Sequence, residues 1–175
     1  MELAFTRDMF MKIAIISDIH DNIVNLKKCL SYLSQEKIEV LVCCGDMTNV
    51  DTLRSLAEYF SGQINLVRGN IEIYDEEEVE LYKNIKYYGR SGILGIDGQL
   101  VGLCHEPFLM KYLLEKKEKL NIVFYGHTHK PWIEDRGGVK LVNPGTLGGV
   151  FQRATFSVWD TDSKSLELKV LDQII

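Results

Sequence analysis

The sequence predicts a mixed α/β domain built from two β-sheets. Three strand–helix steps follow one another in the first part of the chain, which favours a parallel sheet with right-handed crossovers. A hairpin signal, Asp97-Gly98, stands in the middle, and the last quarter of the chain is mostly short apolar strands. At 175 residues the chain is long enough to bury one sizeable core, so one domain is expected.

Three apolar runs predict buried strands in the first part of the chain, at 13–16, 39–44 and 64–67. Between them, apolar residues recur at helical spacing over 22–37 and over 53–60. This spacing predicts two helices that each bury one face. The order strand, helix, strand, helix, strand is that of a parallel sheet.

The middle of the chain is less regular. The acidic run 75–80 is interpreted as a solvated surface rather than a site. Two strands, 92–97 and 99–104, flank the hairpin turn, and 107–120 is expected to form a helix with proline in its first turn. The remaining apolar runs predict strands at 121–125, 132–135, 139–142, 155–159 and 166–171.

Composition and charge narrow the class of protein. Apolar residues make up 46% and charged residues 26% of the chain, as in ordinary globular proteins. The net charge of −5 argues against a general nucleic-acid binder, which must neutralise phosphates with lysine and arginine. No apolar run approaches the ~18 residues that a membrane span needs, so no membrane contact is expected.

Two features favour a cytoplasmic protein. The N-terminus lacks the basic and apolar regions of a signal peptide. No C-x-x-C pair occurs, so we interpret the four cysteines as buried reduced thiols: Cys29, Cys43, Cys44 and Cys104. The first strand follows directly on Met11, so residues 1–10 are expected to be an extension that contributes little to the core of a domain spanning 11–175.

Side chains that can bind a metal follow the predicted strands. Asp18 and His20 come just after the first strand, and in an extended backbone two such residues point the same way. The alternative is a helix cap at Asp21 or Asn22 beside an exposed histidine. Every histidine of the chain occupies such a place, and the candidate ligands are Asp18, His20, Asp46, Asn70, His105, His127 and His129. If these strand ends converge, imidazoles and carboxylates meet in one crevice, as a borderline divalent cation prefers.

Glycines precede several of these residues. Gly45, Gly69 and Gly126 each stand just before a candidate ligand. We expect the chain to turn sharply there and to approach an ion closely, although simple turn glycines are the alternative.

The ordered blocks of the sequence resemble a known signature. The blocks are Asp18-x-His20, Gly45-Asp46, Gly69-Asn70, His105 and Gly126-His127-x-His129. In this order they resemble the calcineurin-like metallophosphoesterases, and within them the small single-domain phosphodiesterases of the YfcE type. The resemblance covers nearly all of residues 11–175. It implies a four-layer αββα sandwich of two mixed β-sheets flanked by helices, with a two-metal site at the strand ends.

The resemblance also implies roles for these residues. One divalent ion would take Asp18, His20 and His129, the other would take Asn70, His105 and His127, and Asp46 would bridge them. The ions would be Mn, Ni, Fe or Zn. They would supply a bridging hydroxide that attacks a small phosphate-ester substrate, most simply a phosphodiester, without a covalent protein nucleophile. A non-catalytic protein-interaction scaffold on the same fold and a nuclease are the alternatives, and a homo-oligomer is compatible with the sequence.

Two departures from the family pattern bear on the substrate. In the first, many relatives carry a histidine where this chain has Ile71, and close relatives often have aspartate where it has Glu72. In the second, the block around His105 reads Cys-His-Glu-Pro where relatives often have His-Gly-His. Protonation of the leaving group then has no obvious donor, so esters with good leaving groups, such as aryl phosphodiesters, are expected to react best. Arg68 is a weak candidate for holding a phosphate oxygen, with a structural ion pair as the alternative. The segment 143–146, Asn-Pro-Gly-Thr, resembles a family loop near the metals, and an ordinary turn is as good an interpretation.

Overall fold

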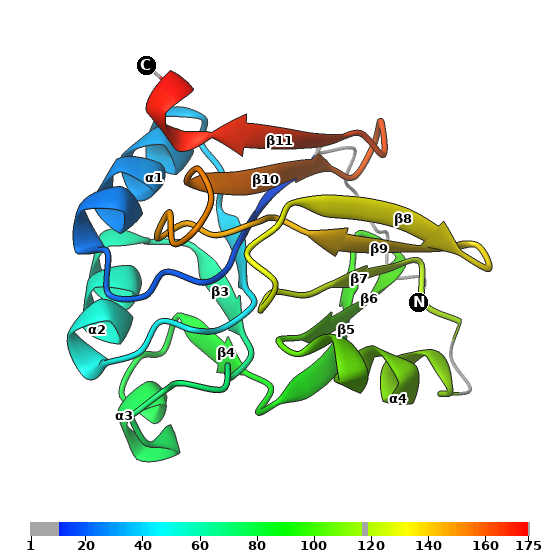
Figure 1. Ribbon diagram of the computed structural model, residues 1–175, viewed down its shortest axis with the longest axis horizontal. Helices are drawn as coiled ribbons and strands as arrows, with labels where there is room; N and C mark the ends of the chain where they lie inside the picture. The colour runs from blue at the N-terminus through cyan, green and yellow to red at the C-terminus, as the bar shows by residue number, and fades with distance from the viewer. Residues whose placement is uncertain (1–10, 117–118, 175) are drawn as a thin grey trace, which may run out of the picture.

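Two β-sheets pack face to face in the computed structural model, which describes residues 11–116 and 119–174 (Figure 1). The first sheet has six strands: β1 (Lys12–Ile16), β2 (Val40–Cys43), β3 (Gln63–Leu66), β4 (Ile85–Tyr87), β10 (Thr155–Asp160) and β11 (Leu166–Val170). The second has five: β5 (Ser91–Ile96), β6 (Gln99–Cys104), β7 (Ile122–Phe124), β8 (Trp132–Arg136) and β9 (Val139–Asn143). The expected extension, residues 1–10, lies outside the described residues.

The helices connect and flank these strands. They are α1 (Ile23–Gln35), α2 (Val50–Tyr59), α3 (Glu76–Glu80) and α4 (Met110–Leu114), with two short 3₁₀ turns, η1 (Pro107–Leu109) and η2 (Leu171–Gln173). Helix α1 joins β1 to β2, and α2 joins β2 to β3, as the strand–helix steps of the sequence predict.

Both sheets mix parallel and antiparallel pairs. The six-stranded sheet has the order β11-β10-β1-β2-β3-β4, in which β1 to β4 are parallel and β10 runs antiparallel to β1 and β11. The five-stranded sheet has the order β5-β6-β7-β9-β8, in which β6, β7 and β9 are parallel and the two outer strands are antiparallel. Parallel strands in each sheet bring several carboxyl ends to one edge, where open α/β sheets bind ligands.

The core has three apolar layers between four layers of secondary structure. Strand β1 alternates in the expected way: Ala14 and Ile16 pack in the cluster with α1 and α2, whereas Ile13 and Ile15 pack between the two sheets. A third cluster joins α4 to the outer face of the five-stranded sheet. Figure 1 shows α1 and α2 along one side of the molecule and α4 along another. The predicted four-layer sandwich of two mixed sheets is thereby confirmed.

The structure corrects one local prediction and adds two short elements. The helix predicted over 107–120 is one 3₁₀ turn followed by α4, which ends at Leu114, because only Met110 and Leu113 of these two elements are buried. The acidic run forms the short helix α3, whose capping box joins Asp75 and Glu78, and negative charge in a first turn favours a helix. Strand β4 was not predicted, because it has three residues and is defined by its pairing with β3.

The cysteines agree with the prediction of buried reduced thiols. All four cysteines are free and buried, and burial raises the pKa of Cys43 and of Cys104 to about 12 each. These side chains are therefore thiols rather than thiolates at neutral pH. Among the helices of residues 11–116 and 119–174, none has the length and apolarity that crossing a bilayer requires.

Candidate metal centre

Seven side chains from five strand ends meet on one side of the sandwich. They follow strands of both sheets: Asp18 and His20 after β1, Asp46 after β2, Asn70 after β3, His105 directly after β6, and His127 and His129 after β7. These are the seven candidate ligands of the sequence, and contacts of 2.9–3.8 Å connect them within two groups.

The first group contains Asp18, His20 and His129. The Asp18 Oδ1 atom lies 3.2 Å from Nε2 of His129 and 3.8 Å from Nε2 of His20. The two Nε2 atoms lie 3.0 Å from each other. One carboxylate oxygen and two ring nitrogens thus converge within 4.8 Å, as the donors of a bound divalent cation must.

The second group contains Asp46, Asn70, His105 and His127. The Asp46 Oδ2 atom lies 3.2 Å from Nε2 of His105. The Asn70 Oδ1 atom lies 3.0 Å from the same nitrogen and 2.9 Å from Nδ1 of His127. Ligand atoms of Asp18, Asp46 and His105 also fall within 4.8 Å of one another, so the two groups form one continuous cluster.

The backbone at this cluster is bent rather than extended. Five of the seven residues have positive φ: Asp18 (54°), His20 (49°), Asp46 (56°), His127 (71°) and His129 (58°). The extended Asp-x-His geometry expected from the sequence is wrong, because β1 ends at Ile16 and both residues of the pair are left-handed. Such conformations cost of order 1 kcal/mol each and persist where the surroundings fix them.

Hydrogen bonds from neighbouring loops hold these left-handed conformations in place. The amides of Ile19 and His20 both donate to the carbonyl of Asp46, at 2.9 and 3.0 Å. The amide of His127 donates to the carboxylate of Asp18, at 3.1 and 3.2 Å to its two oxygens. Asn22 caps α1 by accepting a hydrogen bond from the amide of Asn25, which confirms the capping interpretation of this stretch. The cap is compatible with the metal interpretation, which stays a prediction.

The segment 143–146 makes hydrogen bonds to two of the loops that carry candidate ligands. The Asn143 side chain donates to the carbonyl of Gly126 at 2.7 Å, and the Thr146 hydroxyl donates to the carbonyl of Asp18 at 2.8 Å. Both residues are buried. This segment supports two of the ligand-bearing loops through their backbone.

Two histidines are oriented with their Nε2 lone pairs toward the cluster. The Nδ1 atom of His105 lies 2.7 Å from the carbonyl oxygen of Cys44, and that of His129 lies 3.2 Å from the carbonyl oxygen of Val150. A carbonyl can only accept, so each Nδ1 carries the proton and Nε2 is free to donate a lone pair. Metal-binding histidines characteristically have such a second partner, so the donor set fits a divalent cation.

The buried carboxylates make the cluster electronegative. The hydrogen bond with Asp18 raises the pKa of His20. Burial by itself lowers the pKa of His105, but the hydrogen bond and the charge of Asp46 raise it overall. Burial would raise the pKa of Asp46, yet the His105 hydrogen bond and charge and the Ile71 amide lower it overall. The same field that favours imidazolium would favour a metal cation.

The three glycines before the ligands approach protein atoms. A Cβ atom on Gly45 would lie 2.6 Å from the amide nitrogen of Gly69, and one on Gly69 would lie 2.0 Å from Oδ1 of Asp46. One on Gly126 would lie 2.0 Å from Oγ of Ser17. The absence of a side chain is required because the ligand-bearing loops pack directly on one another.

Arg68 contacts the backbone of the loop that follows it. Its guanidinium donates to the carbonyl of Glu72 at 3.1 Å and to that of Tyr74 at 3.3 Å. Glu72 is itself buried, and burial raises the pKa of its carboxyl group. A role of Arg68 in holding phosphate stays a prediction, and the bonds to the loop indicate a structural role beside it.

Replacing Arg68 with alanine is expected to lower the free energy of unfolding by about 1–2 kcal/mol, because two carbonyl groups lose charged donors. Urea unfolding measures this change. Arg54→Ala is the control, since Arg54 is exposed and pairs with Asp51 on the surface; it should change stability by no more than about 0.5 kcal/mol. A raised KM without a loss of stability in Arg68→Ala would instead identify a phosphate contact.

Sequence reasoning missed the two residues that contact His129 from the following loop. The carbonyl of Val150 fixes the tautomer of His129, and the ring of Phe151 stacks on its imidazole with the centroids 6.0 Å apart. The only sequence signal is the preceding pair Gly148-Gly149, which marks a loop but not its position.

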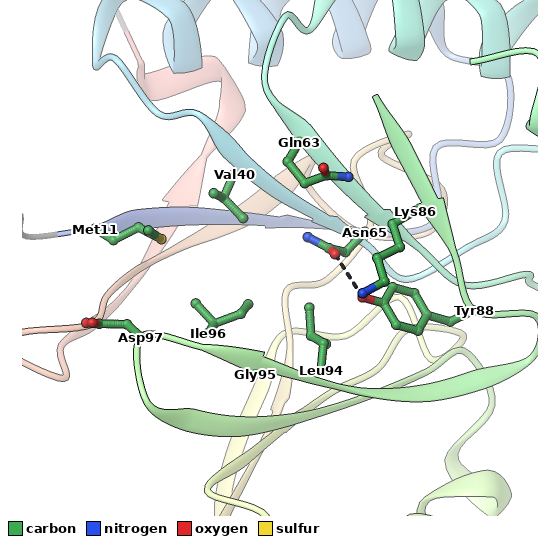
Figure 2. Close-up of a pocket in the computed structure, with 10 residues that line it drawn as sticks. All are labelled: Met11, Val40, Gln63, Asn65, Lys86, Tyr88, Leu94, Gly95, Ile96 and Asp97. Atoms are coloured by element: carbon green, nitrogen blue, oxygen red, sulfur yellow. Dashed lines mark hydrogen bonds between the residues drawn. The ribbon is translucent and has the colours of Figure 1, made fainter. Parts of the chain in front are cut away.

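A cavity of about 340 Å³ lies between the sheets at the opposite ends of the strands (Figure 2). Val40 and Gln63, the first residues of β2 and β3, line it together with part of β5. Its buried Asn65 accepts a hydrogen bond from the Tyr88 hydroxyl at 3.1 Å, and none of the seven candidate ligands lines it. The candidate ligands therefore lie at the other ends of the strands and not at this cavity.

Comparisons with known proteins agree with this geometry. The family described as the calcineurin-like phosphoesterase superfamily domain matches residues 11–164. A phosphodiesterase of Methanocaldococcus jannaschii is 28% identical over 170 residues, covering 93% of this chain and 100% of the relative. The phosphodiesterase YfcE of Escherichia coli is 25% identical over 172 residues, covering 89% of this chain and 91% of the relative. A solved structure of an archaeal phosphodiesterase superposes with a TM-score of 0.82 at 23% identity, covering 91% of this chain and 99% of that one.

Proposed function

Since the chain belongs to the calcineurin-like phosphoesterase superfamily, we propose that it is a metal-dependent phosphodiesterase whose seven clustered side chains hold two divalent ions. The observation that carries this proposal is the convergence of ring nitrogens and carboxylate oxygens from four strand ends, joined by the amide oxygen of Asn70 from a fifth. Relatives named as phosphodiesterases support the reaction type.

The contacts suggest how the ligands divide. Asp18, His20 and His129 would hold one ion, because their donor atoms converge. Asn70, His105 and His127 would hold the other, since the Asn70 carbonyl oxygen lies within 3.0 Å of a nitrogen of each ring. Asp46 would bridge them. Imidazole and carboxylate donors suit Mn, Ni, Fe or Zn.

Such a pair of ions would supply a hydroxide nucleophile at neutral pH and polarise the phosphate. The protein's own contribution is to hold its donors in place: the Asp46 carboxylate is fixed by the amides of Asn70 and Ile71, at 2.9 and 3.3 Å. Two aspartates with neutral imidazoles leave the loaded site positive, which attracts an anionic ester in spite of the chain's net charge of −5.

The substrate preference follows from what the site lacks. Ile71, next to Asn70, has no proton to give, so a leaving alcohol must depart without help from this position. Aryl phosphodiesters, whose leaving groups are stable as anions, are therefore expected to react faster than unactivated alkyl diesters. The buried free thiols support a cytoplasmic location as part of the same proposal.

A substrate and metal panel tests the proposal. Protein stripped by a chelator is assayed with Mn, Ni, Fe or Zn on phosphomonoesters, phosphodiesters and cyclic nucleotides, and bound metal is measured per chain. We expect hydrolysis of aryl phosphodiesters that vanishes on chelation and returns as the metal content approaches two ions. A chain that binds no ion, or hydrolyses no ester with any ion, would favour the interaction-scaffold alternative.

A further inference from the structure

An aromatic side chain stands open to solvent beside the candidate metal centre. Phe151 is 91% exposed, and its ring lies nearly parallel to the imidazole of His129, with an interplanar angle of 21° and the centroids 6.0 Å apart. Val150, the residue before it, accepts the hydrogen bond that orients His129. The phenyl ring is thus connected to a candidate ligand through both its stacking contact and its backbone.

Exposure alone is ordinary for a single apolar residue, but the backbone here is also unusual. Phe151 has φ +62°, a left-handed conformation that a bulky side chain rarely adopts. Solvent exposure of the ring provides no burial that would offset this strain. An observed outlier of this kind beside a functional cluster points to a role in function.

The loop that carries Phe151 is fastened to the loop of Asp18. The Gly148 amide donates to the carbonyl of Asp18 at 2.9 Å, and the Asn22 side chain donates to the carbonyl of Gly148 at 3.0 Å. The Thr146 hydroxyl also donates to the Asp18 carbonyl. These bonds fix the start of the loop relative to the cluster. Binding of a planar group to the ring therefore costs little conformational entropy for ordering the loop.

We infer that Phe151 is a specificity-determining residue, whose ring stacks on a planar aromatic group esterified to the substrate phosphate. This inference rests on the proposed function. If the substrate phosphate binds beside His129, one of its ester groups would lie next to the solvent-exposed face of the Phe151 ring. An aryl group and a nucleobase share the required chemistry, a flat π-face, and aromatic pairs prefer such offset stacking.

Three substrates with one leaving group isolate this contact. They are p-nitrophenyl diesters of phosphate in which the second ester group is methyl, phenyl or 5′-thymidyl. Because p-nitrophenolate leaves in every case, the chemical step stays matched while the retained group changes. Wild type, Phe151→Leu and Phe151→Tyr are compared by kcat/KM in the metal-loaded protein, with Tyr59→Leu, an exposed aromatic change on α2, as the control.

Phe151→Leu is expected to lower kcat/KM about three- to tenfold for the phenyl or the thymidyl diester and to leave the methyl diester within about twofold. Phe151→Tyr should retain the preference, and Tyr59→Leu should change nothing. Selectivity for the phenyl diester alone would identify an aryl group as the ligand, and selectivity for the thymidyl diester alone would identify a nucleobase. An equal effect of Phe151→Leu on all three diesters, or none, would overturn the inference while leaving the proposed function intact.

Binding without turnover gives a second readout. Phenylphosphonate protons should shift upfield on binding to wild type, because they lie over an aromatic ring, and this shift should be lost in Phe151→Leu. Methylphosphonate should bind both proteins equally. An unchanged upfield shift in Phe151→Leu would show that another ring stacks on the ligand and would overturn the inference. Failure of wild type to hydrolyse any of the diesters would overturn the proposed function, and this inference with it.

Discussion

Replacing Asp46 with asparagine is expected to lower kcat/KM by more than the ~10–100-fold that loss of an outer-shell partner typically causes. Asparagine tolerates the left-handed backbone of this position, where φ is 56°. Its carbonyl oxygen can keep the bonds from the amides of Asn70 and Ile71. Its NH₂ group would replace Oδ2, which lies 3.2 Å from His105. The variant should therefore fold and lose the charge that offsets the repulsion between two cations.

The measurements are kcat/KM and bound metal per chain under metal titration, with urea unfolding to confirm the fold. Asn70→Ala is the matched comparison, because it removes one neutral ligand from one proposed ion, and excess metal should restore part of its activity. An Asp46→Asn protein with near-wild-type activity and two bound ions would refute the bridging role and the mechanism that depends on it.

Gly126→Ala is expected to abolish activity and to cost on the order of 3 kcal/mol of stability. The added Cβ atom would lie 2.0 Å from Oγ of Ser17, 2.8 Å from Oδ2 of Asp18 and 3.0 Å from Nδ1 of His105. Two of these neighbours are candidate ligands, so relief of the clash must displace them. Gly95→Ala is the control, since a Cβ atom on Gly95 meets nothing within 4 Å.

The double variant Ser17→Ala/Gly126→Ala separates folding from function. Removing the Ser17 hydroxyl eliminates the closest contact and should recover part of the unfolding free energy. The contact with the Asp18 carboxylate remains, so activity should stay lost. Gly126→Ala with normal stability and normal turnover would mean that the loops at the strand ends are looser than their packing indicates.

The fold could be predicted to the extent that it depends on local pattern. The buried runs of β1, β2 and β3 and the helical spacing of α1 and α2 are visible in the sequence, because each element buries a regular face. Strand β4 and the short α4 could not be predicted in the same way. The pairing of β4 with β3 is a tertiary contact, and α4 ends where its buried face ends.

The candidate ligands could be found because each follows a strand, but their geometry could not. The sequence suggested that Asp18 and His20 point together from an extended chain, whereas both are left-handed and converge through the turn between them. The carbonyls that orient His105 and His129 belong to Cys44 and Val150, whose side chains give no sign of this role. Backbone groups have no signature in a sequence.

Because the cluster takes side chains from both sheets, ions bound there would cross-link the two sheets. β1, β2 and β3 belong to one sheet, and β6 and β7 belong to the other. The unfolded chain has no such arrangement of ligands, so the free energy of metal binding would add to the free energy of folding. The concentration of available metal would then determine the stability of the protein against unfolding as well as its catalytic rate.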